Sequence, residues 1–386
     1  MKRSLDRILV THAGSLPRPP DLRELVAAKS SGQPYDAAAL ARRLREAVAE
    51  VVRRQVGSGI DIVNDGELSK SNFMNYARER LAGFEVREFQ PGEEPPRVSI
   101  SARDQQEFPE YFATRGGRAT IGTNPRRAYC VAPLRYVGHE AVQTDIANLQ
   151  AALEGVDVAE AFLPAVAPGT IEHWLANAYY PSDEAYLYAI ADAMHEEYKA
   201  IVDAGFVLQI DDPDLPDAWQ IHYDLSVEEY RRFAELRIDA LNHALRGLPE
   251  ERIRLHVCWG SYHGPHKHDI PLRAIVDLVL KVRAGAYSIE AANPRHEHEW
   301  QVWEEVRLPE GKALIPGVVS HCSDFIEHPE LVAQRLVRFA RLVGRENVIA
   351  GTDCGLGERV GHPSIVWAKF EAMAEGARLA SRQLWG

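Results

Sequence analysis

Four residues in the last third of the chain carry side chains that could bind one metal ion together. Each stands at the end of a short apolar run that predicts a buried strand: His256 and Cys258 in LHVCWG, Glu290 in YSIEAANP, and Cys354 in AGTDCGLG. His256 and Cys258 are two positions apart, so on a strand their side chains point to the same face. One imidazole, two thiolates and one carboxylate form a ligand set that suits zinc. We therefore take these four residues as candidate zinc ligands.

Simpler explanations exist for each of these residues. A buried cysteine is commonly a small hydrophobic residue of the core, and a glutamate at a strand end is often a cap or a salt-bridge partner. A second cluster, His263, His266 and His268 in SYHGPHKHD, also has spacing that could bind metal, but it lies in a Gly/Pro loop without sulfur. A solvated, hydrogen-bonded loop is the favoured interpretation there. Cys130, in an apolar run, is expected to be inert core.

The ligand set also indicates a type of chemistry. Four protein ligands ordinarily make a closed, structural zinc site, whereas a site on the rim of a barrel is expected to be catalytic. We therefore expect one ligand, Glu290, to give way when a substrate thiol arrives. Two thiolates and a carboxylate outweigh the charge of the ion, which keeps a bound substrate thiolate electron-rich. The expected reaction is attack by a zinc-bound thiolate on an alkyl carbon.

The elements that must position these residues alternate between strand and helix. Apolar runs predict strands at 8–12, 60–64, 157–166, 207–211, 253–258, 286–291, 313–319 and 347–352. Helical periodicity predicts helices at 40–56, 183–203, 226–245, 271–283, 329–343 and 365–383. A ninth apolar run, 128–134, is excluded from the barrel, because the polar stretch before it shows no helical period and cannot supply a crossover helix. The prediction is an α/β fold, a (β/α)8 TIM barrel forming a single domain over 1–386, with a long insertion, 84–136, after the second strand.

Composition narrows the possible partners and the compartment. The formal net charge of −12 argues against a nucleic-acid surface and favours an acidic, soluble enzyme. No apolar run is long enough to span a membrane, and no cleavable leader is expected. The 4 cysteines are far apart in the chain, which favours a reducing cytoplasm over a disulfide framework. The oligomeric state is left open.

Six segments in order, spread over nearly the whole chain, resemble the cobalamin-independent methionine synthase family, specifically its catalytic C-terminal barrel. They are THAGSLPRP, IVNDGELSK, APGTIEHW, LQIDDPDL, LHVCWG and GTDCGLG. Full-length members carry a second, N-terminal barrel that this chain lacks. The chain is therefore similar to the short, single-barrel branch, which also includes epoxyalkane:coenzyme M transferases.

The resemblance implies roles for individual residues. His256, Cys258, Glu290 and Cys354 fall on the family's zinc ligands. The positions that correspond to substrate-binding residues are Ser15 for the carboxylate of homocysteine, Glu67 and Asp211 for its amino group, and Trp174 for the pterin ring of the methyl donor. His321, in SHCS, lies one position away from the family's proton-donating histidine.

The chain also departs from the family pattern. Asp212 replaces the usual glutamate after Asp211, and Asp214 replaces a small alanine, which changes charge and volume beside the substrate. Taken without the resemblance, Glu67 and Asp211 are equally well explained as salt-bridge partners at the barrel rim.

Three functions remain open. The first is zinc-dependent methyl transfer from a folate-like or other methyl donor to the thiol of homocysteine. The second is alkyl transfer to another thiol, such as coenzyme M opening an epoxide, for which Arg18 and Arg135 could bind a sulfonate. The third is a non-catalytic zinc or ligand-binding barrel, which an intact ligand set with two substrate carboxylates disfavours. Retention of Glu67 and Asp211 favours an amino thiol, and therefore the first function.

Overall fold

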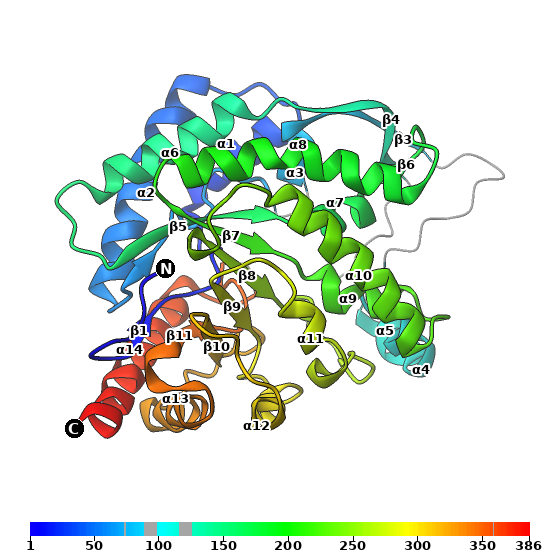
Figure 1. The fold of residues 1–386 in the computed structure, drawn as a ribbon. Helices are drawn as coiled ribbons and strands as arrows, with labels where there is room; N and C mark the ends of the chain where they lie inside the picture. Colours follow the sequence, from blue (N-terminus) through cyan, green and yellow to red (C-terminus); the bar gives the residue numbers. More distant parts are fainter. Residues whose placement is uncertain (73–74, 89–98, 116–125, 358) are drawn as a thin grey trace.

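An eight-stranded parallel barrel surrounded by helices dominates the computed structural model, which describes residues 1–72, 75–88, 99–115, 126–357 and 359–386 (Figure 1). The barrel strands are β1 (Leu9–Val10), β2 (Ile62–Val63), β5 (Glu160–Val166), β7 (Val207–Asp211), β8 (Ile253–Val257), β9 (Ala286–Ile289), β10 (Ala313–Val319) and β11 (Ile349–Thr352). Their hydrogen-bonded order is β1-β11-β10-β9-β8-β7-β5-β2. The Asp61 amide donates to the Val10 carbonyl at 2.9 Å, which joins the two end strands and nearly closes the barrel. The predicted (β/α)8 fold is therefore confirmed.

The eight barrel strands are the eight that the sequence predicted, although most of them are shorter. β8 ends at Val257, β9 at Ile289 and β11 at Thr352. Cys258, Glu290 and Cys354 therefore lie just beyond the carboxyl ends of their strands, on the rim where barrel enzymes place their active sites.

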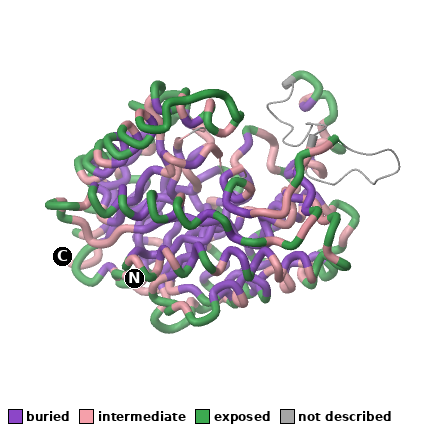
Figure 2. Tube along the Cα trace, turned by 90° about the horizontal axis from the view of Figure 1, so that it is seen from above, coloured by how far each residue is buried: buried purple, intermediate pink, exposed green. Residues whose placement is uncertain are grey.

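The long helices cover the outside of the barrel. They are α1 (Pro20–Ser30), α2 (Ala37–Gly57), α6 (His139–Leu153), α8 (Asp183–Asp203), α10 (Val227–Ala244), α13 (Pro329–Val343) and α14 (Pro363–Trp385). In α2 the apolar stripe that predicted the helix is buried, including Leu44 and Val48. Helix α13 begins at Pro329 and ends before Gly344, whose φ of 90° favours glycine. Figure 2 shows this buried interior enclosed by exposed and half-buried outer faces.

The predicted helix over 271–283 is wrong. The chain forms only a 3₁₀ turn, Leu272–Ala274, and one α-helical turn, α11 (Val276–Val279). Between them Ile275 has φ −132° and ψ −6°, outside the helical region, so the two turns do not join. The apolar residues still face the core, which explains why their spacing resembled that of a helix.

A second, three-stranded sheet lies outside the barrel. Strand β4 (Arg126–Tyr136) pairs antiparallel with β3 (Leu81–Glu88) and parallel with β6 (Ala176–Asn177). The run 128–134 is thus a strand that does not belong to the barrel, as predicted. Two short helices, α4 (Ala102–Glu107) and α5 (Pro109–Arg115), were not predicted, because fewer than two turns show no period. Residues 89–98 and 116–125 of the predicted insertion lie outside the described residues.

Short helices complete the rim of the barrel. They are α3 (Asn75–Arg80), α7 (Pro168–Trp174), α9 (Asp214–Ile221) and α12 (Val302–Glu305). Helix α7 follows β5 directly and α9 follows β7, so both begin at the carboxyl ends of barrel strands. These two helices therefore place Trp174 and the aspartates of α9 beside the strand-end residues.

Apolar side chains from nearly every barrel strand form one buried cluster of Leu9, Ile62, Phe162, Val207, Ala286, Ala313, Ile315 and Ile349. Strand β8 contributes Arg254 instead, whose guanidinium lies 3.5 Å from the Phe162 ring centre and donates to Gln209 at 2.7 Å. His256 is two positions further along β8, so it lies on the same face as Arg254 and nearer the carboxyl end.

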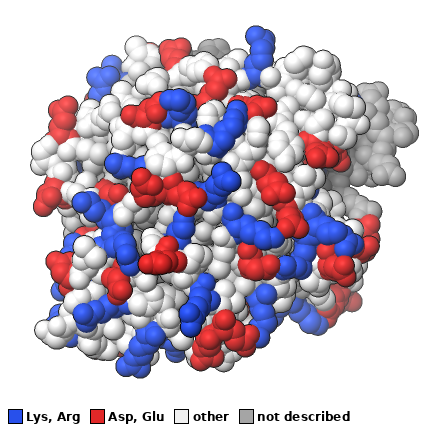
Figure 3. Space-filling view, viewed as in Figure 1, with Lys and Arg blue, Asp and Glu red and all other residues white. Residues whose placement is uncertain are grey.

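Two further observations concern the outer surface. Among the described residues, no helix is both long enough and apolar enough to cross a bilayer. Figure 3 shows lysine and arginine side chains interspersed with aspartate and glutamate over the face that it presents.

Candidate active site

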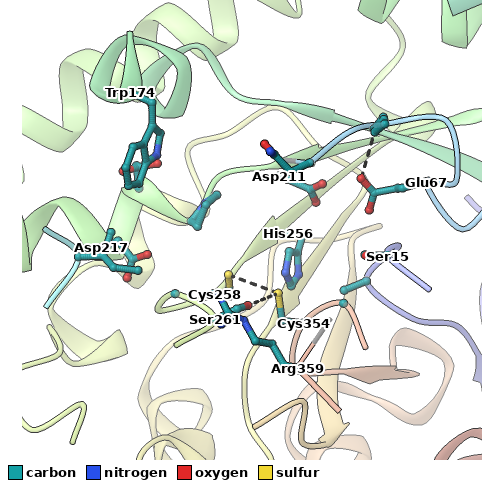
Figure 4. Close-up of a pocket in the computed structure, with 18 of the residues that line it drawn as sticks. Ser15, Glu67, Trp174, Asp211, Asp217, His256, Cys258, Ser261, Cys354 and Arg359 are labelled. Atoms are coloured by element: carbon teal, nitrogen blue, oxygen red, sulfur yellow. Dashed lines mark hydrogen bonds and ion pairs between the residues drawn. The ribbon is translucent and has the colours of Figure 1, made fainter. Parts of the chain in front are cut away.

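A cavity of about 260 Å³ lies at the carboxyl ends of the barrel strands (Figure 4). Its lining includes seven of the nine predicted site residues: Ser15, Glu67, Trp174, Asp211, His256, Cys258 and Cys354. Glu290 and His321 are not among the lining residues. The fold therefore brings residues from six different strand ends into one cavity.

Three of the four predicted metal ligands form a compact group. One nitrogen of His256 and the sulfur atoms of Cys258 and Cys354 all lie within 4.8 Å of one another. The two sulfur atoms are 3.7 Å apart, and the Ser261 hydroxyl donates to the Cys354 sulfur at 3.1 Å. One imidazole and two sulfur donors at this spacing fit a single tetrahedral ion of zinc type.

The orientation of His256 also fits a metal ligand. Its Nδ1 lies 3.1 Å from the Ser288 hydroxyl, whereas its Nε2 is buried and has no hydrogen-bond partner. A buried nitrogen without a partner costs free energy, and metal ligation removes that cost. A hydrogen bond on the other ring nitrogen is the usual way in which proteins orient a ligating histidine.

Glu290 lies outside the compact group of three. It is buried, its Oε2 accepts from the Asn293 side chain at 3.0 Å, and its Oε1 has no partner. Burial raises the pKa of Glu290 well above its usual value, and the neighbouring Asp353 and Cys354 raise it further. The unpartnered oxygen is available to an ion, so Glu290 stays a predicted ligand.

The two cysteines of the group have opposite acidities. The pKa of Cys354 is lowered, first by the hydrogen bond with Cys258 and then by His256, against the effect of burial. The pKa of Cys258 is raised well above its usual value by Cys354 and by burial. A divalent cation between the two sulfur atoms would favour ionisation of both.

Glu67 and Asp211 face the cavity from the ends of β2 and β7 (Figure 4). Burial raises the pKa of Glu67, and the Lys70 ammonium, 3.5 Å from Glu67 Oε2, opposes that rise. Burial raises the pKa of Asp211 to about 7, and Gln209 donates to its Oδ1 at 2.6 Å. Two carboxyl groups on one cavity wall can hold an ammonium group.

The backbone at Glu67 supports a functional role. Its φ of 56° is in the left-handed region, which residues other than glycine rarely adopt. The turn is held by two side-chain contacts, from the Gly66 amide to Asn64 at 2.8 Å and from the Glu67 amide to Asp65 at 3.0 Å. Strain of this kind persists at sites where it positions a side chain.

Trp174 and Ser15 form two other walls of the cavity. The indole of Trp174 stacks on His173, with ring centres 4.8 Å apart and planes 27° apart, and it also lines the cavity. Ser15 touches the loop after β11, where a Cβ on Gly355 would lie 2.8 Å from the Cβ of Ser15. Only glycine permits this approach, which brings the first and last strand ends together.

His321 is buried behind the cavity wall. Its Nε2 lies 3.2 Å from the Cys322 sulfur, and its Nδ1 has no partner. Burial lowers the pKa of His321 to about 4, so the ring is neutral at pH 7. Its role as a proton donor stays a prediction.

The alternative histidine cluster is tied into its loop by hydrogen bonds. His266 lies 2.9 Å from Asp269 and 3.0 Å from the Tyr262 carbonyl, and His268 lies 2.5 Å from Glu107. The cluster does not appear as a metal-binding group among the described residues. The hydrogen-bonded loop that the sequence favoured is what the structure shows.

Four lining residues that could act on a ligand were not predicted: Lys70, Asp217, Ser261 and Arg359. Asp217 is buried, its Oδ1 has no partner, and burial and Asp214 raise its pKa well above the usual value. The only signal in the sequence was proximity to predicted residues, since Lys70 follows Glu67 by three positions and Ser261 follows Cys258 by three.

One protein family matches most of the chain. The family described as cobalamin-independent synthase, catalytic domain, matches residues 8–90 and 165–378, which is more than half of the chain. This chain belongs to the cobalamin-independent synthase family. The matched residues include every lining residue named above.

Relatives of the same family match over most of their length. A methionine synthase of Thermococcus kodakarensis is 24% identical over 88% of this chain and 84% of its own. A methionine synthase from Sulfurisphaera tokodaii is 24% identical over 97% of this chain and 93% of its own length. The match thus extends through segment 91–164, which the family model leaves out.

Solved structures confirm the fold. A B12-independent methionine synthase from a Shewanella species, in complex with selenomethionine, superposes with a TM-score of 0.71 at 21% identity, covering 98% of this chain and 99% of the other. A B12-independent methionine synthase from Listeria monocytogenes, described as putative, superposes with a TM-score of 0.65 at 17% identity. The superposition covers 98% of this chain and 99% of the other.

Proposed function

We propose that this cobalamin-independent synthase is a zinc-dependent methyltransferase that methylates the thiol of homocysteine, taking the methyl group from a folate-like or other donor. The observation that carries the proposal is one cavity lined by His256, Cys258 and Cys354 on one side and by Glu67 and Asp211 on another. The names of the relatives and the family match support methyl transfer of the methionine synthase kind.

The metal-binding residues fit zinc by their chemistry. His256, Cys258 and Cys354 would hold the ion, with Glu290 as the exchangeable fourth ligand. When bound, zinc supplies a Lewis-acid centre that lowers the pKa of a substrate thiol, so that the sulfur attacks as a thiolate. Ser288 keeps the Nε2 of His256 directed to that centre.

The carboxylates recognise the rest of the thiol substrate. An ammonium group between Glu67 and Asp211 would be bound by charge-assisted hydrogen bonds. It would also favour the ionised form of Asp211, whose pKa burial raises to about 7 in the free protein. The buried carboxyl pair therefore favours a thiol substrate that carries an ammonium group.

The donor lies on the other side of the cavity, against Trp174. Figure 4 shows Trp174 across the cavity from Glu67, with the sulfur atoms of Cys258 and Cys354 between them. A flat donor stacked on the indole would present its methyl group to that sulfur side. Transfer forms a carbon–sulfur bond and breaks the bond to the leaving atom, which keeps the electron pair. A nitrogen leaving atom then needs a proton. His321 is the predicted donor, which requires that bound substrate raise its pKa above the value of about 4 in the free protein.

The alternative, alkylation of a sulfonated thiol such as coenzyme M, finds less support than the sequence suggested. Arg18 lines the cavity, but its guanidinium already donates to the Leu68 carbonyl at 3.0 Å and to the Glu67 carbonyl at 3.1 Å. Arg135, on the exposed side of β4, does not line the cavity.

The proposal is tested with zinc-loaded protein, homocysteine and a panel of methyl donors that includes a 5-methyltetrahydropteroyl and a sulfonium compound. We expect zinc-dependent methionine formation, measured by mass spectrometry, with at least one donor. Calorimetry in buffers of different ionisation enthalpy should count close to one proton released on thiol binding below pH about 8.5. Absence of proton release would mean that the thiol does not bind as thiolate, which contradicts the mechanism.

His321 has its own test. His321→Ala should slow methyl transfer by about a hundredfold or more while thiol affinity stays unchanged, because a proton is needed only as the leaving atom gains charge. Single-turnover rates and calorimetric affinities separate the two effects. Equal loss of rate and affinity would point to a structural role for this buried ring.

A further inference from the structure

One residue that lines the cavity comes from the segment between β3 and β4. The family model leaves out residues 91–164, and among the described lining residues Ile100 alone belongs to that segment. Its side chain is buried in an apolar cluster of Ile100, Phe112, Ile221 and Tyr262. The shape of the cavity at Ile100 is therefore set by residues outside the match to the family.

Ile100 lies at the donor end of the cavity. Trp174 packs against the same apolar cluster. A Cβ on Gly260 would lie 3.1 Å from the Cδ1 of Ile100 and 2.8 Å from the Oδ2 of Asp217, so the isoleucine lies against the loop that follows β8. Figure 4 shows Trp174 and Asp217 together on the side of the cavity away from Glu67. Ile100 therefore bounds the space in which a donor on the indole would lie.

Helix α4 begins two residues after Ile100 and is anchored to the barrel. The Asp104 carboxylate is fully buried and accepts from the Tyr262 hydroxyl at 3.0 Å. The Arg103 guanidinium donates to the Trp219 carbonyl, in α9, at 2.8 Å. These contacts would break if α4 moved away from the cavity. The Ile100 side chain therefore resists displacement by a bulky ligand.

The cavity is small for a site that holds two substrates. Its volume is about 260 Å³, whereas a pocket for one drug-sized ligand typically has about 300–1,000 Å³. A thiol at the metal-binding residues would occupy part of this space. The remaining part, between Trp174 and Ile100, suits a compact group.

We propose that Ile100 limits the size of the methyl donor, so that the site favours a compact donor, such as a methyl sulfonium compound, over a pteridine. This rests on the proposed function, because it requires a donor opposite a thiol. At an apolar wall, one methylene group changes affinity by about 10–200-fold. The residue at position 100 should therefore decide which donors bind, while homocysteine and zinc bind as before.

The test measures binding of two donors, dimethylsulfonioacetate and 5-methyltetrahydrofolate, to the zinc-loaded protein by calorimetry. The parent should bind the sulfonium compound about tenfold or more tightly than the folate. Ile100→Ala should tighten folate binding by about tenfold and leave sulfonium binding within about threefold, and Ile100→Val should have a smaller effect in the same direction.

The matched control is Ile221→Val. Ile221 is buried in the same apolar cluster and is not among the described lining residues, so its variant should keep the ratio of the two donor affinities. Thermal unfolding checks that each variant is folded. If the larger truncation, Ile100→Ala, does not fold, the comparison of Ile100→Val with Ile221→Val decides.

The outcomes separate this inference from the proposed function. Folate binding as tight as sulfonium binding in the parent, or binding of neither donor, would overturn the size limit and leave methyl transfer to homocysteine to its own assay. The same affinity ratio in the parent and the Ile100 variants, or an equal shift in Ile221→Val, would also overturn it. Failure of methionine formation with every donor would overturn the proposed function, and the donor role of this end of the cavity would fall with it.

Discussion

The metal-binding end and the carboxylate end of the cavity are completed in different ways. At the metal-binding end, His256 Nε2 and Glu290 Oε1 are buried without partners, and two sulfur atoms lie 3.7 Å apart. At the carboxylate end, Lys70 faces Glu67 at 3.5 Å and Gln209 donates to Asp211 at 2.6 Å. The metal-binding end has buried polar atoms without hydrogen-bond partners, whereas the two carboxyl groups at the other end have partners within the protein.

This difference separates what an ion does from what a substrate does. The metal-binding end reaches full satisfaction only with a cation, so loss of one ligand should abolish binding there. The carboxylate end is stable without a ligand, so a substitution there should weaken the substrate contact and leave the metal in place. The predictions below test this difference, from the largest expected effect to the smallest.

The largest effect is expected from the sulfur ligands. Cys354→Ala should reduce zinc from about one ion per chain to near zero, because only two ligands of the compact group remain. Metal analysis after dialysis provides the measurement, and Cys130→Ala, a buried cysteine outside the site, is the matched control. Full zinc content in Cys354→Ala would remove that residue from the ligand set. The same assay on Glu290→Gln decides whether the fourth ligand is needed.

The second effect is the pH dependence of the free energy of unfolding. It arises from His296, which packs against the segment that carries the predicted metal ligand Cys258. The His296 ring stacks on Trp259, the residue after Cys258, and is paired with Asp269 and Glu299. Burial alone would lower the pKa of His296, but the two carboxylates raise it to about 9. A raised pKa stabilises the fold below the unfolded value of about 6.5 and loses that stabilisation as pH rises through about 9.

The expected loss between those pH values is on the order of 3 kcal/mol. Denaturant unfolding at pH 6, 7.5 and 9.5 measures it, and His296→Gln should flatten the dependence. A parent protein whose stability is level across this range would show that the paired ring gains nothing from its charge.

The third effect belongs to the carboxylate end. Glu67→Gln and Asp211→Asn should each weaken homocysteine binding by about 1.5–3 kcal/mol through loss of a charge-assisted contact to the ammonium. Zinc content should stay at the parent level, in contrast to Cys354→Ala. Binding of 3-mercaptopropionate, which has no amino group, is the control and should change little. Parent affinity for homocysteine in both variants would favour a thiol without an amino group.

The smallest effect is expected from Ser288, which touches a ligand and not the ion. Ser288→Ala removes the hydrogen bond that orients His256 and should lower zinc affinity by about tenfold to a hundredfold. Competition with a chelator of known affinity measures the change. Ser261→Ala tests the contact to the Cys354 sulfur in the same way, and unaltered affinity in both variants would mean that backbone packing alone orients the ligands.

Local patterns in the sequence were sufficient for most of the barrel. Each strand is a short apolar run, and helices such as α2 and α13 carry apolar stripes with a glycine at or just after their ends, so strand and helix could be read without tertiary contacts. The segment 271–283 failed because its apolar residues face the core from two separate turns, and Ile275 between them is non-helical. Spacing records which side chains are buried, not how the backbone connects them.

The sequence by itself determined the candidate ligands and the rim on which they stand. His256 and Cys258 share a strand face by their spacing, and residues at the ends of parallel strands meet on one rim. The tertiary structure alone decided which of them come within 4.8 Å, and it left Glu290 outside that group. It also placed Lys70 beside Glu67 and Arg359 beside the sulfur atoms, contacts that depend on turns and loop anchors between distant segments. Such contacts arise from packing over long sequence separations, which no local pattern of residue types records.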